Sequence, residues 1–177
     1  GVGNATFSGT MALSKGVTLT ADVDKSATFS GAFSGNQAVT LDGPGGKVVF
    51  SGGTGNDFSL MTINSGFVDF NKNAGVNAVD SDLIINNGSL TWQNRNQIAD
   101  TANVTVHGGT LNLAGNREKI NTLNMDVGTT LTLAFGSFEL GGSGDSVING
   151  TISGSAAVID DRDPQPGSKF YNSGSGT

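Results

Sequence analysis

The chain has 177 residues, of which 36% are apolar and only 14% are charged, while 28 are glycine. So few apolar residues cannot form a thick globular core, but they can form a thin one if each short strand contributes two inward side chains. Cysteine is absent, which excludes thiol catalysis, disulfides and thiolate metal sites, and the net charge of −6 disfavours nucleic-acid binding.

An apolar pair at positions i and i+2 recurs along the chain from its first residues. It begins at Ala5 and Phe7 and returns at steps of 20 to 22 residues. The later pairs are Ala27/Phe29, Val48/Phe50, Val68/Phe70, Leu90/Trp92, Leu111/Leu113 and Leu131/Leu133, followed by Ile152 in a less regular repeat. Because alternate residues of a strand point to the same side, these pairs predict one stacked column of inward side chains.

A second column of apolar pairs runs in parallel with the first at nearly the same period. Its members are Val17/Leu19, Val39/Leu41, Met61/Ile63, Leu83/Ile85, Val104/Val106 and Leu123/Met125. A third, looser column contains Leu13, Phe33, Phe58, Val76, Ile98, Ile120 and Leu140. Three columns at one period predict three short strands in each turn of a coil.

The fold class expected from these columns is all-β. We expect a right-handed single-stranded parallel β-helix, a solenoid of about seven or eight rungs of 20–22 residues with three short strands per rung. A βαβ arrangement is excluded because no helical segment of about ten residues separates the strands. Residues 1–154 are predicted to form the β-helix, and residues 155–177 an irregular loop or cap that leads to a truncated next rung.

Polar turns occupy matching positions between the second and first columns. Asn64-Ser65-Gly66, Asn86-Asn87-Gly88 and His107-Gly108-Gly109 are the clearest of them. Glycine and asparagine tolerate the positive φ that a sharp corner requires. Asparagine side chains stacked in such turns are expected to hydrogen-bond from rung to rung.

The segment from Ala102 to Met125 carries a more specific pattern, in which a short strand is followed by Gly-Gly-Thr-Leu-Asn-Leu, a polar turn and Ile-Asn-Thr-Leu. This pattern resembles the autotransporter-associated β-strand repeat of bacterial passenger domains. The matches cover roughly residues 60–154, whereas the first 50 residues fit by periodicity alone. The stretch from Ala156 to Tyr171 departs from a regular rung.

The resemblance implies a secreted or bacterial cell-surface protein, whose full-length form is translocated through an outer-membrane β-barrel. The expected function is that of a non-enzymatic passenger stalk or adhesin segment, associated with virulence, with a host or matrix glycan or protein as its partner. An alternative is an extracellular structural subunit that stacks end to end, because an uncapped β-helix end is an unpaired strand edge. A third and less favoured hypothesis is a glycan-binding or glycan-degrading β-helix.

The titratable residues offer few combinations that could form a catalytic site. His107 is the only histidine, and it lies at a turn corner next to the positions of Asn86 and Asp126. The acidic residues Asp80 and Asp82 are candidates for polysaccharide cleavage. Their scattered arrangement favours surface charge, so no catalytic residue and no cofactor are predicted.

Two groups of carboxylates are candidate calcium ligands. Asp57 lies in Gly52–Leu60, which nearly fits a calcium-binding nonapeptide but has Phe58 one position early and no second copy. Asp160, Asp161 and Asp163 gather three carboxylates in one short stretch. We interpret both groups as solvated loops and predict no metal.

Lys72, Arg95 and Arg117 fall in the same turn of successive rungs. They are the candidate ligand-binding residues, because a basic stripe on an acidic protein suits sulfated or acidic glycans. Turn lengths differ by a residue from rung to rung, so scattered surface charge is the alternative reading.

Overall fold

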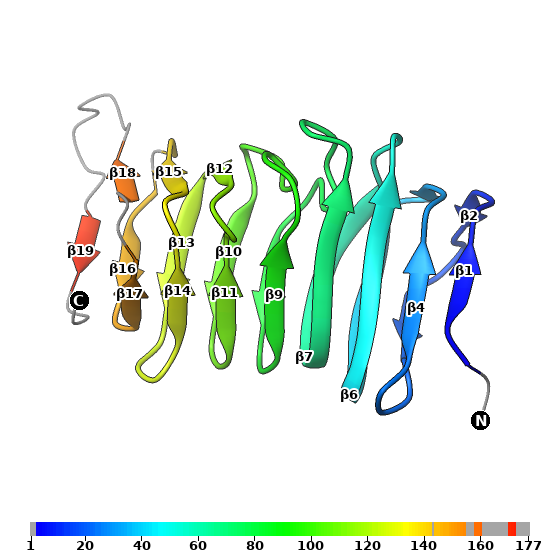
Figure 1. Ribbon diagram of the computed structural model, residues 1–177. Coiled ribbons are helices and arrows are strands. Elements are labelled where there is room, and N and C mark those ends of the chain that lie inside the picture. The colour runs from blue at the N-terminus through cyan, green and yellow to red at the C-terminus, as the bar shows by residue number, and fades with distance from the viewer. Residues whose placement is uncertain (1–2, 143, 155–157, 161–169, 173–177) are drawn as a thin grey trace.

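The computed structural model describes residues 3–142, 144–154, 158–160 and 170–172 of the chain. These residues form a parallel β-solenoid of about seven turns, and no helix occurs among them. Figure 1 shows the coil advancing in one direction, from β1 (Ala5–Phe7) at one end to β19 (Phe170–Asn172) at the other. The all-β fold class and the parallel solenoid predicted from the repeat are therefore confirmed.

Three faces of the coil carry the strands. The first face holds β1 (Ala5–Phe7), β4 (Ser26–Phe29), β9 (Ser89–Trp92), β11 (Thr110–Asn112), β14 (Thr130–Thr132) and β17 (Thr151–Ser153). The second face holds β3 (Val17–Leu19), β8 (Leu83–Ile85), β10 (Asn103–Val106), β13 (Thr122–Met125), β16 (Ser146–Ile148) and β19 (Phe170–Asn172). Two long strands, β6 (Gln37–Gly52) and β7 (Phe58–Lys72), pair with strands of both faces and join them into one sheet.

The register between neighbouring rungs is the one that the two apolar columns predict. On the first face, Leu111 pairs with Leu90 on one side and with Leu131 on the other. On the second face, Val104 lies between Leu83 and Leu123. Each of these side chains is fully buried. The two columns are therefore continuous ladders of core residues.

The third face is less regular, and two of its positions were predicted incorrectly. It holds β2 (Met11–Ala12), β5 (Phe33–Ser34), β12 (Arg117–Ile120), β15 (Ser137–Leu140) and β18 (Val158–Asp160). Phe33 pairs with Met11 rather than with Leu13. Ile98 pairs with Val79 rather than with Val76, because Val76 closes a turn by donating its backbone N–H to the Asn73 carbonyl.

Aromatic rings form a continuous stack along the coil, which begins at the exposed Phe7 and continues through buried side chains. Phe7, Phe29, Phe50, Phe70 and Trp92 contact one another in succession, with ring centroids 5.0–6.2 Å apart. Trp92 then contacts Phe138 of the third face at 6.3 Å with the rings perpendicular. Such edge-to-face pairs add to the free energy gained by burial. Trp92 is fully buried and so belongs to the core.

The corners depend on glycine and on asparagine, as the sequence predicts. Gly109 has a φ of +87°, and a Cβ at this position would lie 2.0 Å from the carbonyl oxygen of Gly88. The Asn86 amide donates to the Asn64 side chain in the turn of the preceding rung at 2.8 Å. Hydrogen bonds between stacked turns thus continue the pairing of the strands outside the sheets.

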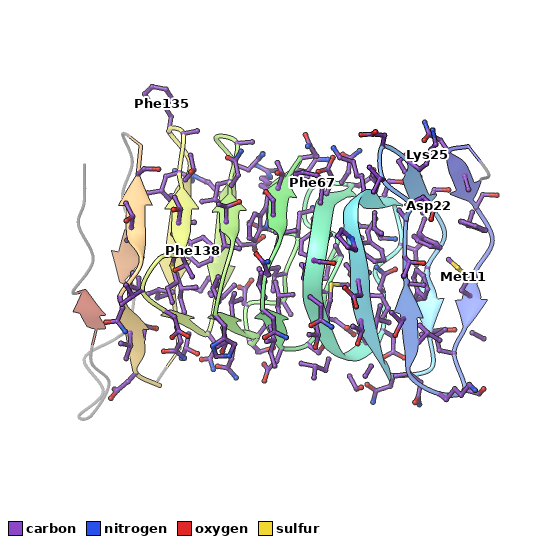
Figure 2. All side chains as sticks on the ribbon, turned by 90° about the horizontal axis from the view of Figure 1, so that it is seen from below. Met11, Asp22, Lys25, Phe67, Phe135 and Phe138 are labelled. Carbon is purple, nitrogen blue, oxygen red and sulfur yellow. The ribbon has the colours of Figure 1, made fainter. Side chains whose placement is uncertain are left out.

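One corner has a bulky residue where the corner of the preceding rung has glycine. Phe135 has a φ of +71° and an 83% exposed side chain, and it occupies the position that Gly115 takes one rung earlier. In Figure 2 its side chain projects away from the body, whereas that of Phe138 points inward. A left-handed conformation costs a residue with a Cβ about 1–2 kcal/mol, so this corner is locally strained.

Most of the segment predicted as an irregular loop or cap, residues 155–177, lies outside the described residues. Within it, β18 pairs in parallel with β15, and β19 pairs in parallel with β16. These two strands extend the third and second faces.

Substitutions at an inward and an outward position should differ sharply. Leu111→Asp places a carboxylate in the core ladder and should destabilise the solenoid by at least about 3 kcal/mol. Thr105 is partly exposed and points outward, so Thr105→Ala should cost less than about 1 kcal/mol. Urea unfolding followed by circular dichroism measures both, and equal midpoints for the two variants would contradict the register.

Candidate functional site

A groove of about 410 Å³ lies on the third face, where β12 and β15 meet the corners of the preceding rungs. Its cationic lining residues are Arg95, Arg117 and Lys119, and its acidic ones include Asp100 and Glu139. The chain has only nine lysines and arginines in total, so one third of its cationic side chains line this groove. It is therefore the strongest candidate for a binding site among the described residues.

The hollow arises from small residues at one corner and an interrupted strand next to it. Ala74 and Gly75 line the groove, and neither has a side chain long enough to fill it. Backbone hydrogen bonds from Gly75 to Arg95 and from Asn96 to Arg117 stack three successive corners. The groove therefore rests on backbone whose position is fixed by the coil.

The charges of the groove are only partly compensated. Lys119 lies opposite Glu139 in the register of β12 and β15, and their side chains form an ion pair at 2.5 Å. The side chains of Arg95 and Arg117 are exposed and form no ion pair or hydrogen bond with any described residue. Their guanidinium groups are available to an anionic ligand.

A buried carboxylate lies directly beneath the groove. Glu118 is 2% exposed because it occupies an inward position of β12. One of its oxygens, Oε2, accepts hydrogen bonds from Trp92 Nε1 at 2.6 Å, Gln97 N at 2.7 Å and Ile98 N at 3.3 Å. Burial raises the pKa of Glu118 to about 8, although these hydrogen bonds oppose the shift.

Further buried polar side chains continue this arrangement toward the N-terminus. Gln97 is fully buried, and its Oε1 accepts the backbone N–H of Lys72 at 2.8 Å. The Lys72 ammonium donates to the Gly31 carbonyl at 3.0 Å, and burial lowers its pKa to about 8. Asn56 bridges Phe33 N and Ala78 O. We call Asn56, Lys72, Gln97 and Glu118 the polar seam.

Of the three predicted ligand-binding residues, the structure brings two together. Arg95 and Arg117 line the same groove, whereas Lys72 is fully buried and its side chain belongs to the polar seam. The prediction that Lys72 shares a surface stripe with them was therefore wrong. Lys72 occupies an inward position at the end of β7, where its long side chain runs back through the interior toward Gly31.

Lys119, Asp100, Glu139 and Glu118 were not predicted as site residues. The alternation Arg117-Glu118-Lys119-Ile120 contains a usable signal, because the inward position of Ile120 makes Glu118 inward and Arg117 and Lys119 outward. Asp100 gives no such signal, since it lies in a corner of irregular length.

The candidate acidic residues cap backbone groups of neighbouring rungs. Asp57 Oδ2 accepts the N–H groups of Gly35 and Asn36, and Asp80 accepts that of Phe58 at 2.8 Å. Burial raises the pKa of Asp80, with a smaller contribution from the nearby Asp57. Asp82 accepts the N–H of Asn103.

The candidate metal ligands are not assembled in the part of the chain that is described. No group of three histidine, cysteine, aspartate or glutamate side chains that could hold a metal ion occurs there. Asp161, Asp163 and the side chain of Asp160 lie outside it.

His107 pairs with Asp126 on the next rung, as their stacking predicts. Its Nδ1 lies 2.9 Å from Asp126 Oδ2, and both side chains are more than half exposed. No hydroxyl group of the described residues completes a hydrogen-bonded triad with this pair.

Comparison of the chain with family models, with curated proteins and with solved structures found no match.

The raised pKa of Glu118 gives a testable pH dependence. The folded protein holds a proton here up to a pH of about 8, whereas the unfolded carboxyl releases it near 4.5. The free energy of unfolding should therefore fall as the pH rises from 5 to 8, by up to about 1.4 kcal/mol per pH unit from this group. Urea unfolding at several pH values measures the slope. Glu118→Gln should reduce the slope of the unfolding free energy against pH. An unchanged slope in that variant would show that another group causes the pH dependence.

Proposed function

We propose that this chain is a non-enzymatic segment of a bacterial cell-surface or secreted β-solenoid, acting as a stalk or adhesin that binds partners on its lateral surface. The observation that carries the proposal is the unbroken rung-to-rung pairing from β1 to β17 on the first face. A stack of this kind is a stiff spacer whose surface repeats along its length.

The sequence supports the assignment to an exported passenger. The segment from Ala102 to Met125 resembles the autotransporter-associated repeat, and it forms regular rungs in which β10, β11 and β12 pair with the following strands. The absence of cysteine also suits a chain that crosses the periplasm unfolded.

The polar contacts support binding rather than turnover. The carboxylates of Asp57, Asp80 and Asp82 hydrogen-bond to the backbone of neighbouring rungs, which is a structural task. Arg95 and Arg117, in contrast, present free donors in a groove on the lateral surface. A host or matrix glycan is the partner class that such a surface favours.

Localisation of the native protein tests the proposal. Antibodies raised against the chain should label intact cells that produce it, or detect it in their culture medium, without permeabilisation. The purified chain should also release no product from a panel of polysaccharides. An antibody to a cytoplasmic protein serves as the control. Labelling that requires permeabilised cells, or cleavage that is lost in Asp80→Asn, would contradict the proposal.

A further inference from the structure

The groove between Arg95 and Arg117 has the features of a site for a specific ligand class. We propose that it binds a sugar unit carrying a single carboxylate or sulfate within an extended acidic glycan. This inference rests on the proposed function, because it names the ligand of the lateral surface. The volume of the groove, about 410 Å³, falls within the range of small-molecule sites.

The anion would be held by the two guanidinium groups. The side chains of Arg95 and Arg117 have no hydrogen-bond or ion-pair partner among the described residues, and arginine binds carboxylate and sulfate through paired N–H donors. They come from successive corners whose backbones are hydrogen-bonded, Asn96 N to Arg117 O at 2.9 Å. Both residues therefore line one groove from corners whose backbones are hydrogen-bonded to each other.

The remaining charges limit the ligand to low charge density. Lys119 is paired with Glu139, and Asp100 adds a carboxylate at the edge of the groove. Glu118 also lines the groove, and its raised pKa of about 8 keeps this carboxyl uncharged at neutral pH. Two unpaired guanidinium groups against the one remaining carboxylate, Asp100, then leave a local excess of one positive charge. A polyanion such as nucleic acid would in addition meet the net charge of −6 on the chain.

The acidic and polar groups also match the hydroxyl groups of a sugar. Asp100 and Glu139 can accept hydrogen bonds from hydroxyl groups, while Asn96 and Ser137 can donate and accept them. The groove thus combines one anion position with several hydroxyl positions. This is the pattern of a monosaccharide unit with one acidic substituent rather than of an inorganic anion.

The floor of the groove is held rigid from below. Glu118 lines the groove together with its neighbours Arg117 and Lys119, and its carboxyl accepts the backbone N–H groups of Gln97 and Ile98 beneath. A preorganised floor reduces the entropy lost on binding. Binding is therefore expected without a rearrangement of the coil.

Titration of the 177-residue chain with three oligosaccharides tests the inference by isothermal calorimetry. The probes are oligogalacturonate, a sulfated galactan oligosaccharide and a neutral galactan oligosaccharide. We expect one or both acidic probes to bind and the neutral one not to bind, and the two acidic probes distinguish carboxylate from sulfate. Arg95→Ala and Arg117→Ala should each weaken binding roughly tenfold, the cost of losing a charge-assisted hydrogen bond.

Lys15→Ala and Lys25→Ala provide matched controls, because they remove exposed lysines far from the groove and should leave affinity unchanged. Equal weakening by the control variants would indicate diffuse charge attraction and overturn the site. Failure of both acidic probes to bind would overturn the inference. The proposed function would not fall with it, because antibody labelling of intact cells tests that function independently. Circular dichroism of each variant verifies that the coil is intact.

Discussion

The register between rungs is the constraint on which the rest of the structure depends. Each strand satisfies its backbone hydrogen bonds only by pairing with the rungs before and after it, so a shift of one residue would turn a whole inward column outward. The ladder from Ala5 to Ile152 and the aromatic stack that ends at Trp92 and Phe138 both follow from this register. Core packing and backbone pairing are thus fixed together.

The corners differ in length from rung to rung. The polar seam makes this possible, because its side chains hydrogen-bond to the backbone where the strand pairing is interrupted. Where the third face lacks a continuous strand, Asn56, Gln97 and Glu118 bond to backbone groups that would otherwise be unpaired in the interior. A buried donor or acceptor left unpaired costs about 1–3 kcal/mol, so these side chains replace the missing sheet. The same interruption leaves the small residues Ala74 and Gly75 facing outward and opens the groove above the seam.

The two regular faces could be predicted from the sequence because a period-two pair repeated every 19 to 22 residues has only one register that buries every member. The third face could not, since corner lengths vary and a single apolar residue, such as Val76 or Val79, does not fix a register. For the same reason Arg95 and Arg117 could be placed in one corner region, while Lys72 was assigned to the wrong side of the backbone. Sequence periodicity identifies inward positions, but a buried lysine or glutamate at such a position is recognised only through its partners.

Amide hydrogen exchange by NMR tests most directly whether buried side chains take over the role of the missing sheet. Gln97 and Ile98 lie outside the strands, yet their N–H groups are bound to the buried Glu118 carboxylate. The account predicts that these two amides exchange as slowly as those of β9 and β11 in the adjoining sheet. Exchange as fast as that of the exposed corner residue Thr54 would show that the seam does not hold the third face, and would contradict the account.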